Sequence, residues 1–241
     1  MKTTVKIQSG NVKMIAHRGL SGLERENSCR AFIAAGNREK YFGIETDVHR
    51  TADGKYVTIH DGNALRVASV DLEIESSTFE EVRNVILNDV EGGTEKSDIR
   101  IPTLEEYISI CSRYGKKAIL EYKFPFPKEH VEEIINIIKD MGYLENVIFI
   151  SFYREPLVYT RELLPDQKIQ YLTSLFSDEI LDFLKTNNFD YDANHTSITE
   201  ERMKLLKEAN IEVNVWTVDS PERAKELIDL GVDYITTNIL E

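Results

Sequence analysis

The stretch KAILEYKFPFPKEHVEEIINIIKDMGYLENVIFIS, residues 117–151, holds a complete strand–helix–strand pattern. Apolar residues dominate 117–123 and 146–151, whereas in residues 128–142 they recur three and four positions apart, as on one face of a helix. Two strands joined through a helix lie parallel in one sheet, with a right-handed crossover. This stretch therefore predicts an α/β fold built on a parallel sheet.

The same alternation continues over the rest of the 241 residues. Eight strand–helix units in a chain of this length predict a closed (β/α)8 TIM barrel, forming a single domain over residues 1–241. The alternative is an open doubly wound sheet, which usually shows a glycine-rich turn after its first strand, and no such turn is present. The expected strands are 12–17, 42–48, 117–123, 146–151, 168–172, 189–193, 212–218 and 233–237, and the expected helices are 27–38, 103–114, 128–142, 154–164, 178–187, 199–210 and 220–231.

One segment interrupts this rhythm after the second strand. Residues 50–62 predict a hairpin that turns at Asp53-Gly54. The residues that follow are polar and only weakly helical. We therefore expect a small insertion after strand 2, approximately residues 61–100, at the carboxyl-terminal rim of the barrel, where the long loops of such barrels usually carry function.

The formal net charge of −13 argues against nucleic acids and anionic membranes as partners. The two cysteines, Cys29 and Cys111, lie far apart inside helical patterns and give neither a disulfide framework nor metal-ligand spacing. No stretch has the length of a transmembrane span, and the first residues lack the apolar core of a signal peptide. These features predict a cytoplasmic protein without stable membrane insertion, and they leave the oligomeric state open.

Three carboxylates are expected at the ends of two neighbouring strands. Glu45 and Asp47 point to the same face of strand 42–48, and Glu121 ends strand 117–123. Carboxylates held together in a buried place repel one another unless a cation lies between them. Salt bridges to Lys or Arg would be the alternative. An all-oxygen set of three favours one divalent cation, Mg²⁺ or Ca²⁺.

Two histidines end apolar runs beside these carboxylates, and each has a polar neighbour. His17 ends the first strand and His60 ends the hairpin, so the pair can supply a general acid and a general base near neutral pH. Arg18 and Lys123 add local positive charge that suits an anionic substrate. The sequence does not say which histidine is the acid.

Phe152 and Trp216 end strands on the same rim. Aromatic residues there usually pack in the core, but both are candidates for the wall of a substrate pocket. His49 continues the alternation of Glu45 and Asp47 and is expected to line the pocket, while the role of His195 after the sixth strand stays open.

Together these motifs resemble the glycerophosphodiester phosphodiesterase family. The matching residues are His17-Arg18-Gly19, Glu26-Asn27-Ser28, Glu45-Thr46-Asp47-Val48, Thr51-Ala52-Asp53-Gly54, Val57, His60-Asp61, Glu121-Tyr122-Lys123 and Trp216-Thr217. The resemblance covers essentially the whole chain, and the combination is specific although each fragment alone is weak. The chain departs from the family pattern at Arg25, Ser28 and Asn238.

This resemblance implies a TIM barrel that hydrolyses small-molecule phosphodiesters to sn-glycerol 3-phosphate and an alcohol. It implies a metal held by Glu45, Asp47 and Glu121, with His17 and His60 as acid and base. Arg18 and Lys123 would hold the phosphate, and the insertion would cover the glycerol side. Two alternatives remain: the same site acting on lysophospholipids or cyclic phosphodiesters, and a non-catalytic barrel that binds a phosphorylated ligand.

Overall fold

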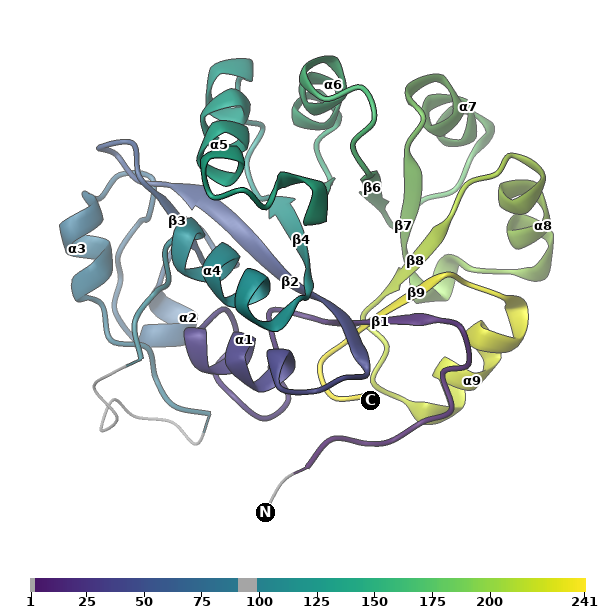
Figure 1. Cartoon of the computed structure of the whole chain (residues 1–241), viewed down its shortest axis with the longest axis horizontal. Coiled ribbons are helices and arrows are strands. Elements are labelled where there is room, and N and C mark those ends of the chain that lie inside the picture. Colours follow the sequence, from purple (N-terminus) through teal and green to yellow (C-terminus); the bar gives the residue numbers. More distant parts are fainter. Residues whose placement is uncertain (1–2, 91–98) are drawn as a thin grey trace.

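The computed structural model describes residues 3–90 and 99–241, and they form a closed barrel (Figure 1). Each strand of the ring pairs in parallel with the next, and pairing between β1 and β2 closes the circle. The predicted (β/α)8 barrel is therefore confirmed, and the open doubly wound alternative is wrong. The strands of the ring are β1 (Lys13–Ala16), β2 (Tyr41–Arg50), β4 (Lys117–Tyr122), β5 (Val147–Ser151), β6 (Ile169–Thr173), β7 (Asp190–Asn194), β8 (Val213–Trp216) and β9 (Tyr234–Thr237).

The helices of the repeating units lie around the outside of the ring (Figure 1). At five of them, α5 and α6 being the exceptions, a side chain before the first turn accepts a hydrogen bond from it, as Ser28 does before α1 and Thr103 before α4. Gly115 and Gly231, both with positive φ, end α4 and α9. These helices are α1 (Cys29–Gly36), α4 (Leu104–Tyr114), α5 (Lys128–Asp140), α6 (Arg154–Leu163), α7 (Asp178–Asn187), α8 (Glu200–Glu208) and α9 (Pro221–Leu230), with short 3₁₀ turns at Leu144–Asn146 and His195–Ser197.

The interior of the barrel holds both apolar and polar side chains. Ile15, Ile119, Ile148, Ile150, Leu172 and Tyr234 belong to one buried cluster. Strands β6, β8 and β9 also carry a hydrogen-bonded chain in which Thr236 donates to Asn214 over 3.1 Å and Asn214 donates to Gln170 over 3.4 Å. The larger core lies between the outer face of the strands and the helices.

The segment after β2 forms the predicted hairpin. Strand β3 (Tyr56–Thr58) pairs antiparallel with β2, outside the ring, and Gly54 takes a positive φ at the turn. Helices α2 (Leu65–Ala68) and α3 (Phe79–Asn84) follow, to one side of the ring (Figure 1), around a small apolar cluster of their own. The predicted insertion at 61–100 includes residues 91–98, which lie outside the described residues, and the single-domain organisation stays a prediction.

None of the helices in the described ranges is long and apolar enough to cross a membrane.

Gly43 shows how tightly β2 and β4 approach beneath the rim. A Cβ at this position would lie 2.9 Å from the Lys117 carbonyl oxygen and closer still to the Ile119 Cδ1 methyl. We predict that Gly43→Ala lowers the free energy of unfolding by about 1–3 kcal/mol, the usual cost of overpacking a well-packed core. Urea denaturation followed by circular dichroism measures this change.

A second substitution tests the cause. Ile119→Val removes the methyl group that the new Cβ would meet, so it should restore part of the stability lost by Gly43→Ala. If the two losses simply add, the close approach between β2 and β4 does not constrain this position.

Candidate active site

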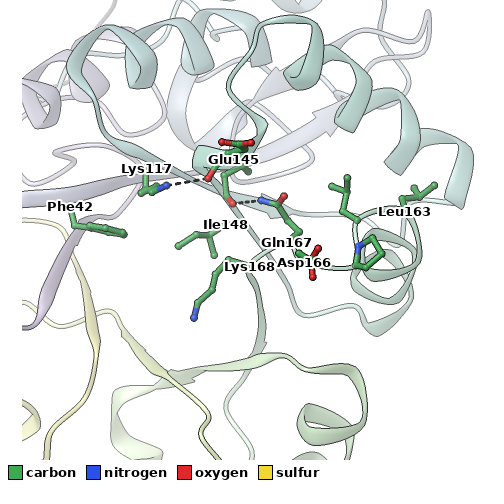
Figure 2. A pocket seen from close by; sticks show the side chains of 11 residues that line it. Phe42, Lys117, Glu145, Ile148, Leu163, Asp166, Gln167 and Lys168 are labelled. Atoms are coloured by element: carbon green, nitrogen blue, oxygen red, sulfur yellow. Dashed lines mark hydrogen bonds between the residues drawn. The ribbon is translucent and has the colours of Figure 1, made fainter.

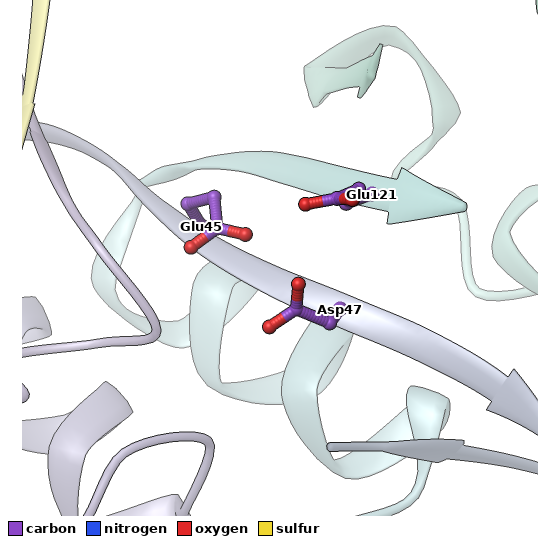
Figure 3. A group of neighbouring side chains, drawn as sticks. All are labelled: Glu45, Asp47 and Glu121. Carbon is purple, nitrogen blue, oxygen red and sulfur yellow. The ribbon is translucent and has the colours of Figure 1, made fainter. Parts of the chain in front are cut away.

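Three buried carboxylates converge at the carboxyl-terminal end of β2 and β4. Asp47 is paired in register with Glu121, and Glu45 lies two residues earlier on the same face of β2. One oxygen of each carboxylate lies within 4.8 Å of one oxygen of each of the others. Figure 3 shows the three side chains pointing toward one another from the two strands.

Burial and mutual repulsion alter how these carboxyls titrate. Burial, together with the negative charge of Asp47, raises the pKa of Glu121 to about 8 and that of Glu45 well above its ordinary value. Burial opposes ionisation of Asp47 as well, but Lys123 and Arg18 overcome it and hold its pKa at about 2. One carboxylate is thus fixed as an anion, and the other two favour protons until a cation arrives.

Lys123 and Arg18 are the basic groups that touch this cluster. The Lys123 Nζ lies 3.0 Å from Glu121 Oε1 and 3.6 Å from Asp47 Oδ1. Arg18 donates its backbone N–H to Glu45 over 2.7 Å, and its guanidinium Nε lies 3.7 Å from Asp47. Three ionised carboxylates and these two cations leave one negative charge unbalanced.

The turn after β1 makes the backbone contact possible. Arg18 and Gly19 both have positive φ, and a Cβ on Gly19 would lie 2.6 Å from the backbone of Ala31. The side chain of Asn27 then donates to Asp47 over 2.7 Å and accepts from Thr46, which fixes the carboxylate from the other side.

The structure fixes the tautomer of His17. The Asn238 amide donates to Asp219 over 2.6 Å, so its Oδ1 is an acceptor toward His17 Nδ1, 2.7 Å away. Nδ1 therefore carries the proton, and the Nε2 lone pair is free. Burial and the neighbouring Arg18 lower the pKa of His17 to about 4, which keeps the ring neutral at ordinary pH.

His60 has a different partner. Its Nδ1 lies 2.6 Å from Asp61 Oδ1, and Asp61 accepts a second hydrogen bond from Arg66 Nε over 2.6 Å. Burial lowers the pKa of His60, while Asp47 and Asp61 oppose that shift. His60 thus has a carboxylate partner that stabilises its protonated form, whereas the partner of His17 is a neutral amide.

Arg66 joins both halves of the site. Besides Asp61, it donates from two nitrogens to the carboxylate of Glu26, each over 2.8 Å. Glu26 in turn accepts from the Arg18 guanidinium over 2.8 Å. Helix α2 of the insertion is thereby tied to both a predicted phosphate-binding residue and a predicted catalytic histidine.

A cavity of about 190 Å³ opens onto these groups, and all but one of the nine predicted site residues line it. The exception is Asp47, the third carboxylate of the acidic cluster, which is buried but does not line the cavity. Phe152 and Trp216 line the opposite wall, with ring centroids 5.6 Å apart in an edge-to-face arrangement. The remaining lining residues are Ile150, Leu172, Asp192, Thr217 and Thr236.

A second hollow of about 500 Å³ lies at the other end of the barrel (Figure 2). Its basic and amide side chains are bound within the protein: Lys117 donates to the Glu145 carbonyl and the Asn146 side chain, Gln167 donates to backbone carbonyls, and Lys168 pairs with Asp190 and Glu212. It is a less suitable candidate site than the cavity at the carboxyl-terminal end, where barrel enzymes carry their active sites.

Other predicted residues lie outside the cavity lining. His49 bonds to Glu75 of the insertion and contacts the backbone of His60, and His195 contacts Arg223. Among the described residues of the insertion after His60, none lines the cavity. The lining thus gives no support to the expectation that the insertion covers the glycerol side. Arg25, one of the departures from the family pattern, anchors the insertion by donating to the carbonyls of Asn88 and Asp89.

Arg66, Asp192 and Asn238 also belong to the surroundings of the cavity but were not among the predicted site residues. For Asp192 a signal was available, because the alternation along FDYDA (189–193) turns it toward the barrel interior. Arg66 and Asn238 act through partners 40 and 221 positions away, and no local pattern reports such contacts.

Known proteins are similar to this chain over nearly its whole length. A protein of Bacillus subtilis, YqiK, is 31% identical over 238 residues, covering 95% of this chain and 96% of that one. A glycerophosphodiester phosphodiesterase of Caldanaerobacter subterraneus is 29% identical, covering 93% of each chain. A phosphodiesterase structure from Oleispira antarctica, in complex with the product sn-glycerol 3-phosphate, superposes with a TM-score of 0.83 at 24% identity, covering 97% of this chain and 96% of that one.

The family model described as the glycerophosphoryl diester phosphodiesterase family matches residues 17–241, beginning at the histidine that ends β1. With its barrel, its acidic cluster and its relatives in agreement, the chain belongs to the glycerophosphoryl diester phosphodiesterase family and is an enzyme of that class.

Proposed function

We propose that this enzyme hydrolyses glycerophosphodiesters to sn-glycerol 3-phosphate and an alcohol, with a divalent cation at the acidic cluster and His17 and His60 as base and acid. The observation that carries the proposal is one small cavity that holds both histidines, Arg18, Lys123 and two of the clustered carboxylates. The Oleispira antarctica phosphodiesterase was solved with sn-glycerol 3-phosphate as its product, which supports the same product here.

The residues of the acidic cluster fit a hard divalent ion. Three carboxylates converge, their full ionisation would leave one negative charge not balanced by Arg18 and Lys123, and Asp47 Oδ1 is buried without a hydrogen-bond partner, with the Lys123 Nζ 3.6 Å away. Glu45, Asp47 and Glu121 would hold the ion. When bound, it would supply Lewis-acid polarisation of the phosphoryl oxygens.

Arg18 and Lys123 bind and orient the phosphate. Both side chains are largely buried at the cavity and keep their positive charge, because the neighbouring carboxylates raise the pKa of each against the effect of burial. Charges held in place in a site with little water stabilise the extra negative charge of the transition state more than solvent can.

His17 is the general base and His60 the general acid. The neutral ring of His17 offers a free Nε2. This nitrogen can take the proton of the hydroxyl group that attacks phosphorus, whether that group belongs to water or to the glycerol of the substrate. The carboxylate of Asp61 stabilises a protonated His60, which can give its proton to the departing alkoxide. Ser151, the last residue of β5, is unsuited to act as a nucleophile. Its buried hydroxyl donates to the Tyr122 carbonyl and accepts from the Tyr153 amide.

A second substrate class is favoured by the apolar wall of the cavity. Ile150, Leu172 and Trp216 line one side, and Phe152 extends it outward with 43% of its surface exposed. An alcohol with an apolar chain, as in a lysophospholipid, could lie along this wall.

We predict that chelation with EDTA abolishes turnover and that Mg²⁺ or Ca²⁺ restores it. The metal-free protein should also become more stable as the pH falls from 8 to 6.5. Since Glu121 has a raised pKa of about 8, the folded state binds more protons than the unfolded state in this interval. A bound cation should flatten this dependence, and thermal unfolding midpoints with and without the ion measure it.

The matched control is Glu121→Gln, which should remove activity and weaken the pH dependence of the metal-free protein. Full activity in a sample shown by elemental analysis to lack metal would contradict the proposal.

We predict that the two histidine variants respond differently to the leaving group. His17→Ala should lose roughly 10²-fold or more in kcat on both glycerophosphocholine and glycerophospho-4-nitrophenol. His60→Ala should lose as much on the first and much less on the second, because 4-nitrophenolate departs without a proton. The reverse pattern would exchange the two roles, and a near-normal kcat on both substrates in either variant would make that histidine structural.

We predict that Arg66→Ala lowers kcat roughly tenfold, because small displacements of positioned groups are costly in rate. Its side chain is partly exposed, so the free energy of unfolding should change by less than about 1 kcal/mol. Arg83→Ala is the matched control, since Arg83 also ties the insertion to the barrel, through Glu106, but lies away from the cavity. Equal kcat losses in the two variants would mean that Arg66 only anchors the insertion.

A further inference from the structure

Asp192 is a buried carboxyl that neither the acidic cluster nor the histidines use. It lies on β7, is 1% exposed and lines the cavity beside Trp216 and Thr236. Its Oδ1 has no hydrogen-bond partner among the described residues. A buried polar atom without a partner is costly, so one that faces a substrate cavity needs an explanation.

The surroundings of Asp192 are polar but uncharged. Burial raises its pKa to about 8, opposed only by the Asn214 side chain. Neither the carboxylates of the cluster nor Arg18 or Lys123 contributes to this shift. Asp192 is therefore separate from the groups that would hold the metal and the phosphate.

A phosphodiester substrate could offer Asp192 an ammonium group, a phosphate oxygen or a hydroxyl, and these differ in how well they suit a buried carboxyl. An ammonium group would need an ionised Asp192, whereas a phosphate oxygen would need a protonated one and is already served by Arg18 and Lys123. A hydroxyl both donates and accepts, so it can pair with either form of the carboxyl. A hydroxyl is also small enough to reach a side chain that lies so deep.

We propose that Asp192 binds a hydroxyl of the glycerol moiety and so makes the enzyme prefer glycerol-bearing phosphodiesters. The inference rests on the proposed function and deepens it. It places the glycerol beside Asp192 on β7 and Thr236 on β9, which both line the cavity. The alcohol that leaves then lies nearer the apolar wall formed by Ile150, Phe152 and Leu172.

Gln170 is the competing candidate in the same polar layer, since its Nε2 is also buried without a partner. It does not line the cavity, and its Oε1 accepts from Asn214. Gln170 therefore holds Asn214 in place, whereas Asp192 is the residue that can contact the substrate.

The test compares two phosphate monoesters that differ in their hydroxyls, sn-glycerol 3-phosphate and propyl phosphate. Calorimetric titration in the presence of Mg²⁺ gives the Kd of each. The unsubstituted enzyme should bind the glycerol compound roughly tenfold or more tightly, the scale of one good hydrogen bond. Asp192→Ala should bring the two Kd values to within about threefold, leaving that of propyl phosphate unchanged.

Asp192→Val is the second variant, because an apolar side chain of similar size keeps the site filled if the alanine variant folds poorly. Asp190→Asn is the matched control: this carboxyl lies two residues earlier on the same strand, pairs with Lys168 and does not line the cavity, so the variant should keep the preference. If both Asp192 variants keep the preference, or weaken the two ligands equally, the proposal is wrong. If the unsubstituted enzyme binds neither monoester, the proposed function itself fails and this inference fails with it.

Discussion

The burial of three carboxylates in one place is the constraint on which the rest of the site depends. Glu45, Asp47 and Glu121 cannot all ionise there without positive charge close by. The chain meets part of this need with Arg18, brought in by a left-handed turn after β1, and with Lys123, which follows β4. The arrangement is stable enough to fold, yet it still favours one further cation.

The sequence predicted the parts of the molecule that depend on local pattern. Period-two alternation placed Glu45 and Asp47 on one face of β2, and parallel pairing brought Glu121 opposite Asp47. The helix boundaries followed from N-caps such as Ser28 and Thr103. The closure of the barrel was an expectation from chain length, because no local residue reports the pairing of β1 with β2 and β9.

Contacts between distant parts of the chain could not be predicted in this way. His17 and Asn238 meet only because closure sets β9 beside β1. Arg66 reaches Glu26, 40 positions earlier in the chain, only because the insertion packs against the segment that follows β1. His17 and Arg18 line the cavity, while Asn238 and Arg66, which hold them directly or through Glu26, come from elsewhere in the chain.

The proposed roles of the two histidines follow from their hydrogen-bond partners, Asn238 for His17 and Asp61 for His60. A neutral amide at Asn238 fixes the proton of His17 on Nδ1 without stabilising an imidazolium strongly, whereas a carboxylate at Asp61 stabilises one. Arg66 moderates this second effect by sharing Asp61, and the same guanidinium holds Glu26 against Arg18. The position of α2 is therefore coupled to both His60, the proposed acid, and Arg18, the proposed phosphate ligand. With these roles, a displacement of that short helix would change proton donation and phosphate binding together, although the described residues of the insertion after His60 do not line the cavity.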